Sequence, residues 1–221
     1  MKRLSVLFFA VISILAFSLT GCSNGDTFTE KSYSTGKNEV EKIVVQVTDR
    51  ELEISASEDE RIYIDYFDSE KEYLDITVSD SKVLTVKLEY NKDWTDFIGT
   101  KPSAAYRKIQ IKIPDKFITM FSASTTNENI KVNPLSFTEQ ISLNANGGNI
   151  VCDRINAGKA ISFIAKNGNI TGTVIGGWDD FSISCKIKKG NCNLPTLKES
   201  GEKSFTADCN NGDINIEFIE K

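Results

Sequence analysis

The sequence predicts an all-β protein, a right-handed β-solenoid or β-roll built from stacked two-strand units of 20 to 22 residues. Three observations predict it: apolar and polar residues alternate over most of the chain, no stretch keeps a helical period, and an Asx residue recurs at a fixed spacing in the second half. A repeat this short cannot bury its own apolar face. Stacked repeats can, because they build two parallel sheets around one continuous core.

The first 21 residues have the features of a bacterial lipoprotein signal peptide. A basic start at Lys2 and Arg3 precedes an apolar run over residues 4–19, which is short for a membrane span. Residues 19–22 (LTGC) form a lipobox, in which small residues before the cysteine expose the bond to a signal peptidase. We therefore expect Cys22 to become the first residue and to carry a covalent diacylglyceryl group and an N-acyl group, with acyl chains such as palmitate. The alternative is an ordinary secretory signal or an uncleaved anchor with an accidental cysteine.

Charge and anchoring together predict where the protein works. Removal of Lys2 and Arg3 with the signal changes the formal net charge from −5 to −7, which argues against nucleic acid as a partner and against binding to anionic lipid through the protein surface. Two acyl chains anchor a protein stably where one does not. The prediction is an extracytoplasmic protein held to the bacterial cell membrane by its lipid, with no other cofactor.

The remaining chain divides into a tether and one domain. Residues 22–37 combine the lipidated cysteine with a Ser-, Thr- and Gly-rich stretch typical of a flexible tether. Residues 38–221 are predicted to form a single solenoid domain, with the clearest repeats over 117–218. Apolar residues alternate in the expected strands at 43–47, 52–54, 62–66, 74–78, 84–88 and 109–113.

The repeat of the second half is aligned on its Asx residue. Glycine precedes that residue in four copies, and a fifth copy lacks the glycine; the five residues are Asn129, Asn149, Asn169, Asn191 and Asp213. The positions eight before, six before and one after are apolar or cysteine in every copy. We expect the glycines to supply left-handed backbone conformations at the corner and the Asx side chains to form a ladder onto turn amides. Calcium is the alternative for such a ladder, but one Asx per rung gives few ligands.

Four cysteines follow the signal, and all fall in inward columns of the repeat. Cys185 and Cys209 are expected about 8 Å apart between Cα atoms, which exceeds the reach of a disulfide. Cys185 and Cys192 share a unit but are expected to face each other across a core about 10 Å thick. The sequence therefore predicts four free buried thiols that act as small apolar side chains: Cys152, Cys185, Cys192 and Cys209.

The chain shows no catalytic constellation. It has no histidine, phosphate loop, dinucleotide fingerprint or metal-binding cysteine pair, so we expect no catalytic and no metal-binding residues. The adjacent Asp179 and Asp180 could serve a polysaccharide-active enzyme, although a glycine-rich turn explains them better. Candidate ligand-binding residues are aromatic: Trp94, Phe97 and Tyr106 in the irregular segment 90–106, and Trp178. The alternative is that these side chains cap the core.

The lipobox, the strand at 106–114 (YRKIQIKIP) and the Gly-Asx-Ile units at 148–150, 168–170 and 212–214 resemble the bacterial putative-adhesin family of β-strand-repeat domains, LiaG-like proteins among them. The resemblance covers residues 40 to 218 and implies a right-handed β-solenoid in the cell envelope, with a largely unassigned function and no catalytic residues to carry over.

The expected function is that of a non-enzymatic envelope lipoprotein whose solenoid displays a binding or scaffolding surface for other envelope proteins or cell-wall glycan. Two alternatives stay open. One is a polysaccharide-active enzyme that uses acids on a sheet face with Trp94 or Trp178 as sugar platforms. The other is a regulatory component of the envelope stress response, which only the family resemblance suggests.

Overall fold

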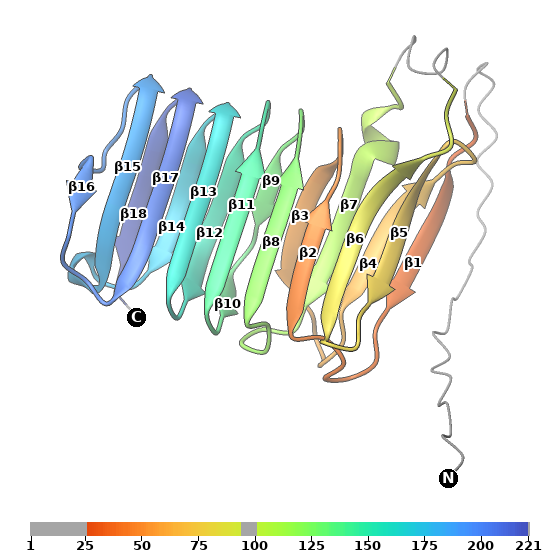
Figure 1. Cartoon of the computed structure of the whole chain (residues 1–221), viewed down its shortest axis with the longest axis horizontal. Helices are drawn as coiled ribbons and strands as arrows, with labels where there is room; N and C mark the ends of the chain where they lie inside the picture. Colours follow the sequence, from red (N-terminus) through yellow and green to blue (C-terminus); the bar gives the residue numbers. More distant parts are fainter. Residues whose placement is uncertain (1–25, 94–100, 221) are drawn as a thin grey trace.

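The computed structural model describes residues 26–93 and 101–220, and within these ranges the fold is all-β, as predicted. Two nine-stranded sheets, which we call sheet A and sheet B, lie face to face with their strands stacked along the long axis of the molecule (Figure 1). The described residues also contain the short 3-10 helices η2 (Ala104–Arg107) and η3 (Trp178–Asp180), which lie in connections.

Sheet A consists, in spatial order, of β1 (Thr29–Ser34), β4 (Tyr63–Asp68), β7 (Lys108–Ile113), β3 (Glu51–Ala56), β9 (Ile130–Val132), β12 (Ile150–Ala157), β14 (Ile170–Ile175) and β18 (Ile214–Ile219), with β10 (Leu135–Phe137) also paired to β12. Sheet B consists of β16 (Leu197–Lys198), β15 (Phe181–Lys189), β17 (Lys203–Asn211), β13 (Ala160–Asn167), β11 (Gln140–Ala145), β8 (Met120–Thr125), β2 (Lys42–Gln46), β6 (Val83–Tyr90) and β5 (Glu72–Val78).

Parallel pairing dominates the middle of both sheets, and antiparallel pairing occurs at their ends. Strands β8, β11 and β13 pair in parallel with aligned repeat positions, so Phe121, Ile141 and Ile161 occupy neighbouring rungs. Antiparallel pairs join β5 to β6, β4 to both β1 and β7, and β15 to β16. The predicted solenoid-like stacking is therefore present, with irregular rungs at the two ends.

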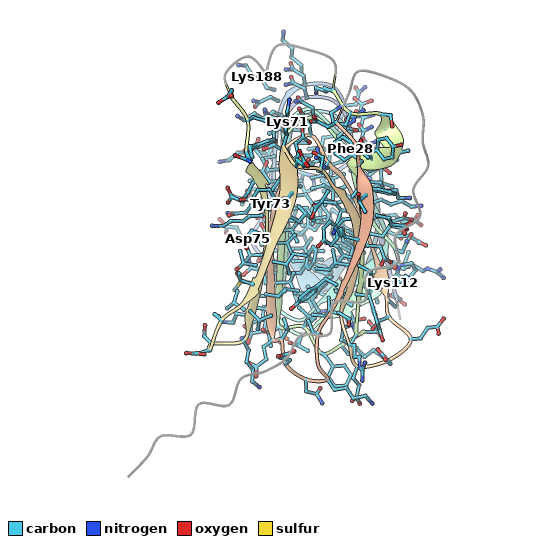
Figure 2. The ribbon with its side chains drawn as sticks, turned by 90° about the vertical axis from the view of Figure 1, so that its right-hand side faces the viewer. Phe28, Lys71, Tyr73, Asp75, Lys112 and Lys188 are labelled. Carbon is cyan, nitrogen blue, oxygen red and sulfur yellow. The ribbon has the colours of Figure 1, made fainter. Side chains whose placement is uncertain are left out.

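The predicted inward columns form the core between the sheets. The positions eight residues before the Asx residue are almost fully buried in every copy: Phe121, Ile141, Ile161, Ile183 and Phe205. The front half contributes to the same core, since Ile43 and Leu52 are fully buried in strands that pair with β8 and β9. One continuous core thus runs through both halves of the chain. Figure 2 views the molecule from the β1 and β5 end, with side chains filling the space between the two sheets.

The spatial order of the rungs differs from the order in the sequence. Strands β17 and β18 lie inside the last rung, because β17 pairs with both β13 and β15. At the other end, β2 and β3 lie between the rung of β6 and β7 and the rung of β8 and β9. The chain doubles back at both ends, so β5 forms the edge of sheet B at one end and β15 and β16 form it at the other, although β1 is still the edge strand of sheet A. The five repeat units therefore stack out of sequence order, with the unit of Asp213 between those of Asn169 and Asn191.

The predicted flexible tether over 22–37 is wrong for its second half. Residues 29–34 form β1, which pairs with β4 along its whole length. Thr35 is buried and its hydroxyl accepts a hydrogen bond from the Ile62 amide at 3.1 Å. A Ser- and Thr-rich stretch can still form an edge strand, because backbone hydrogen bonds to β4 need no apolar side chains.

The four glycines before the Asx residues allow close approach of neighbouring rungs, and only two of them adopt the predicted left-handed backbone conformation. Gly190 and Gly212 have positive φ angles of 122° and 149°, but Gly148 and Gly168 are not in the left-handed region. In all four, a Cβ atom would lie within 2.3 Å of a carbonyl oxygen in the neighbouring rung. Close stacking of the rung corners therefore requires the glycines.

The predicted Asx ladder is present and follows the spatial order of the rungs. The Oδ1 atom of Asn149 accepts a hydrogen bond from the Asn169 amide at 2.8 Å, and Asn169 accepts one from Asp213 at 2.8 Å. Asn129 and Asp213 make the same contact to Asn149 and Asn191 at 2.9 and 2.7 Å. The Asx side chains thus hold adjacent corners together.

We expect Asn149→Ala to lower the free energy of unfolding by about 1 to 2 kcal/mol, because it removes the acceptor of the Asn169 amide. Asn144→Ala is the matched control, since Asn144 lies on an exposed strand position of the same rung, and it should change stability by less than about 0.5 kcal/mol. Urea unfolding of both variants measures the difference. Equal stability of the two would show that the ladder contributes nothing.

The four cysteines of the domain are unbridged, but Cys192 is only partly buried and one predicted distance is wrong. Cys192 lies in the register of sheet A, where it forms an isolated bridge with Ile214, while Cys185 lies in sheet B. Their sulfur atoms are nevertheless only 2.8 Å apart. The inter-sheet distance of about 10 Å is measured between backbones. Two side chains that point inward near a corner extend across most of this distance, so their sulfur atoms can meet.

Candidate binding face

The outward face of sheet B has a continuous column of hydroxyl side chains. Strand register aligns Ser122, Ser142 and Ser162 on three adjacent parallel strands, and Thr206 and Ser184 continue the line on β17 and β15. Successive strands place these side chains about 4.8 Å apart. We call these five residues the hydroxyl column. The strands that carry it, β8, β11, β13, β17 and β15, lie side by side in Figure 1.

The hydroxyl column is accessible to solvent. All five side chains are partly exposed, and none has a side-chain hydrogen bond to another described residue. The columns on either side are also mainly polar, with Gln140 and Asn144 flanking Ser142 on β11. Because each hydroxyl can both donate and accept, the column offers a regular set of hydrogen-bonding groups to a ligand that lies along it.

The outward face of sheet A differs at β3, β7 and β9, where charged side chains pair with one another. Glu53 lies 2.5 Å from Lys108 and 3.7 Å from Lys131, on the two neighbouring strands. The hydrogen bond from Lys108 is the main cause that holds the pKa of Glu53 below its usual value. Sheet A thus has charged groups that are already partnered, whereas sheet B offers hydroxyls that are not.

Tyr106 lies at the β1 and β4 end of sheet A and packs within the fold. Its ring stacks on Phe28 at 5.1 Å between centroids and meets Phe67 edge-on at 5.4 Å. Phe28 belongs to the segment predicted as a tether. Tyr106 thus contacts two other aromatic rings of the fold, and both its role in ligand binding and the alternative of a core cap stay predictions.

Trp178 lies at the opposite end of the molecule, in the turn between β14 and β15. Its ring packs edge-on against Phe218 at 5.7 Å, and the Lys198 ammonium lies 5.8 Å from the ring centroid. The side chain is still 43% exposed. Trp178 and Tyr106 are therefore not parts of one site, because they belong to opposite ends of the strand order.

The two acidic residues beside Trp178, Asp179 and Asp180, belong to the turn between β14 and β15. Asp180 accepts a hydrogen bond from the Gly177 amide at 3.0 Å, which closes the short helix η3. The Asp179 side chain is 98% exposed and lies 4.0 Å from the Lys198 ammonium. The two carboxylates thus do not form a pair, in agreement with the interpretation of these residues as turn chemistry.

Three predicted site residues lie outside the described residues: Cys22, Trp94 and Phe97. Within the described ranges, no group of three or more metal-ligating side chains is arranged around a common point. The same part of the chain contains no helix of the length and apolarity that a membrane span requires.

A hollow of about 620 Å³ lies at the end of the molecule where β1 and β5 are the edge strands. Figure 2 looks at this end, with Tyr73 labelled on β5 and Lys71 just before it. The lining of the hollow includes three acidic residues, Asp26, Asp68 and Glu70, and the basic residue Lys31. Burial raises the pKa of Asp68, which accepts a hydrogen bond from the Leu74 amide at 2.9 Å. The hollow is polar and lies beside the first residues of the domain.

The hydroxyl column was missed in the sequence, although its signal is readable there. The position seven residues before the Asx residue is Ser or Thr in all five copies. An alignment that considers only the apolar columns does not detect this outward position. A column that repeats one small polar residue type on the solvent side is the sign by which it could have been found.

Two sheets of stacked strands around one core, with an Asx ladder at the corners, define an all-β repeat protein with solenoid-like stacking. The chain belongs to the Toastrack DUF4097 family, whose sequence model matches residues 40–221. This agrees with the resemblance to adhesin-like β-strand-repeat domains that the sequence indicated.

The fold is similar to the crystal structure of a putative cell adhesion protein from Clostridium sporogenes, with 14% sequence identity and a TM-score of 0.61 over 87% of this chain and 100% of that one. A putative adhesin from Bacteroides fragilis matches with 12% identity and a TM-score of 0.38, over 89% of this chain and 100% of its own. Among curated proteins, no match was found.

Proposed function

We propose that this chain is a non-enzymatic lipoprotein of the bacterial cell envelope, anchored outside the cell by lipid on Cys22, and that it binds cell-wall glycan along the hydroxyl column of sheet B. The observation that carries the proposal is the contrast between the two faces. In sheet A, Glu53 forms ion pairs with Lys108 and Lys131, whereas the hydroxyl column of sheet B is partly exposed and has no side-chain hydrogen bond to another described residue.

The chemistry of the face supports a polar polymer as ligand. Hydroxyls repeated about every 4.8 Å can exchange hydrogen bonds with the hydroxyl and amide groups of a glycan strand. Sheet B has nine strands, so its face extends roughly 38 Å from β5 to β16. A long ligand could therefore make many weak contacts at once.

The position of the anchor supports a role in the envelope. Since β1 begins at Thr29, only six residues separate it from Cys22. These six residues span at most roughly 20 Å when extended. A lipid on Cys22 would hold the β1 and β5 end near the membrane, with sheet B free along its length. We expect the rungs to coil in the right-handed sense that parallel β crossovers usually adopt.

The name of the Clostridium sporogenes protein, a putative cell adhesion protein, agrees with a binding role of this kind. A polysaccharide-active enzyme is less well supported, because Asp180 closes a turn and Asp179 points to solvent. For a regulatory role in envelope stress, support comes from the family resemblance alone.

Binding to cell-wall fractions tests the proposal. We expect the full chain to be retained by purified cell-wall glycan and the double variant Ser142→Arg, Ser162→Arg to be retained at least tenfold less. The two arginines would replace adjacent hydroxyls with bulky cations. Retention is measured by co-sedimentation of the protein with the insoluble glycan at several protein concentrations.

Thr171→Arg, Asn215→Arg is the matched control, because these residues are register partners on adjacent parallel strands of sheet A. The control should bind as the unmodified chain does. Equal loss in both double variants, or no retention of the unmodified chain, would count against the hydroxyl column. Retention by envelope proteins in place of glycan would show that the ligand is a protein, while sheet B would remain the proposed binding face.

A further inference from the structure

Cys185 and Cys192 lie at the end of the molecule that is opposite β1. Cys185 is on β15, the outer full-length strand of sheet B, and Cys192 is in the segment that crosses from β15 to the edge of sheet A. The two sulfur atoms are 2.8 Å apart, closer than the other cysteines of the described residues come to a thiol. A disulfide has a sulfur separation of about 2.05 Å, so less than 1 Å of movement would form it.

The backbone holds both cysteines in place. The Cys185 amide donates to the Thr196 carbonyl at 3.0 Å, and Cys192 forms a parallel bridge with Ile214. Next to Cys192, the Asn193 side chain pairs with both backbone groups of Ile216, at 2.8 and 3.0 Å. The segment thus adds to the edge of β18 as a strand would, and it fixes the position of Cys192.

We propose that Cys185 and Cys192 form a disulfide that staples this end of the molecule once the protein is outside the cell. The bond closes a short loop of eight residues, from 185 to 192, and links sheet B to sheet A across the open end of the core. Cys152 and Cys209 stay reduced in this proposal, since both are buried and the Cys209 sulfur lies 3.4 Å from the Gly168 carbonyl oxygen rather than against another sulfur.

The oxidant is a disulfide of a thiol–disulfide oxidoreductase or of a small thiol. Cys192 is partly exposed whereas Cys185 is buried, so the Cys192 thiolate attacks the external disulfide first. This forms a mixed disulfide and releases one external thiol. The Cys185 thiolate then attacks the Cys192 sulfur and releases the second external thiol. Two protein thiols lose their hydrogens and two electrons, and one external disulfide is reduced to two thiols.

The second step should be slow without a catalyst. Burial, followed by the contact with Cys192, raises the pKa of the Cys185 thiol to about 12, so little thiolate is present at neutral pH. Once formed, the bond is accessible to a reductant only from its partly exposed Cys192 side, because Cys185 is buried. The staple would therefore be stable in an oxidising compartment.

Peptide mapping tests the proposal on the full chain. Trypsin cleaves after Lys186, Lys188 and Lys189, so Cys185 and Cys192 fall in separate peptides, 167–186 and 190–198. We expect the protein incubated with oxidised glutathione, then alkylated and digested, to yield these two peptides linked, with a mass two hydrogens below their sum. Peptides 132–154 and 204–221, which carry Cys152 and Cys209, should be recovered alkylated. Reduction should separate the linked pair.

A melting experiment adds a second readout. The oxidised chain should melt about 5 °C above the reduced chain, and Cys192→Ser should abolish that difference while Cys209→Ser keeps it. Recovery of peptides 167–186 and 190–198 as separate alkylated species after prolonged oxidation would overturn the proposal. So would a link from Cys185 to Cys209. The peptide map of the unmodified chain decides the matter even if a serine variant fails to fold.

Discussion

Gly168→Ala is expected to lower the free energy of unfolding by about 3 kcal/mol or more, a large effect for the addition of one methyl group. A Cβ at this position would lie 2.2 Å from the carbonyl oxygen of Gly148 and 2.6 Å from its carbonyl carbon. Both atoms belong to the backbone of the neighbouring rung. The rungs would have to separate, and that movement would also strain the hydrogen bond between the Asn169 amide and Asn149.

Gly177→Ala is the control for this prediction. Gly177 has a φ of −67°, which alanine adopts easily, and no atom lies within 4 Å of the Cβ that would be added. The change should be neutral or stabilise the protein by up to about 1 kcal/mol, because alanine restricts the unfolded chain. Urea unfolding at neutral pH compares the two variants. A loss in Gly168→Ala no larger than in Gly177→Ala would mean that the corners do not stack as closely as the structure has them.

Local signals predicted the core and the corner ladder correctly. Alternation places Phe121, Ile141 and Ile161 on the inward side of their strands, and the constant spacing to the Asx residue aligns them across rungs. Both signals are contained within a unit or between neighbouring units. Backbone pairing then follows, because only one register keeps every apolar column in the core.

The order of the rungs could not be predicted in the same way. The units that end at Asn191 and Asp213 have the same spacing and similar apolar columns, so either could stack on the unit of Asn169. The structure places Asp213 there. The choice depends on how residues 190–198 cover the end of the core, which is a tertiary property that no repeat alignment contains.

Residue type likewise does not predict which aromatic side chains lie together in the fold. Tyr106 and Trp178 were grouped by residue type, but the stacking of rungs separates them to opposite ends of the sheets. The polar composition of residues 29–34 predicted a flexible tether, but these residues form β1. They do so because the outer edge of β4 has backbone groups that β1 can pair with. The hydroxyl column, by contrast, was available from the alignment itself.

Glu72→Gln is the second variant with a large expected effect, about 3 kcal/mol or more of destabilisation at neutral pH. The Glu72 carboxylate accepts hydrogen bonds from both Arg50 and Lys92. The side chains of Arg50 and Glu72 are only 3% and 5% exposed. Glutamine would keep the shape but remove the charge, leaving two cations in a poorly solvated position without their counter-ion.

Glu41→Gln provides a comparison in which the same change breaks an exposed ion pair. Glu41 lies 2.6 Å from Lys82, with both side chains about half exposed at 50% and 51%. Water and salt screen such a pair, so the loss should stay below about 1 kcal/mol. Similar losses in the two variants would show that burial adds nothing at Glu72.

The pH dependence gives an independent check on Glu72. Burial alone would raise the pKa of Glu72, but the hydrogen bonds from Lys92 and Arg50 bring it below the ordinary value of 4.5. A carboxyl whose pKa is lower in the folded than in the unfolded chain stabilises the fold fully above pH 4.5, and that contribution is lost as the pH falls through the folded value. The stability difference between the unmodified chain and Glu72→Gln should therefore be constant at neutral pH and shrink below 4.5, since protonated Glu72 is as uncharged as glutamine. Urea unfolding between pH 7 and pH 3 measures it, and a difference that stays constant to the lowest pH would contradict the charged contact with Arg50 and Lys92.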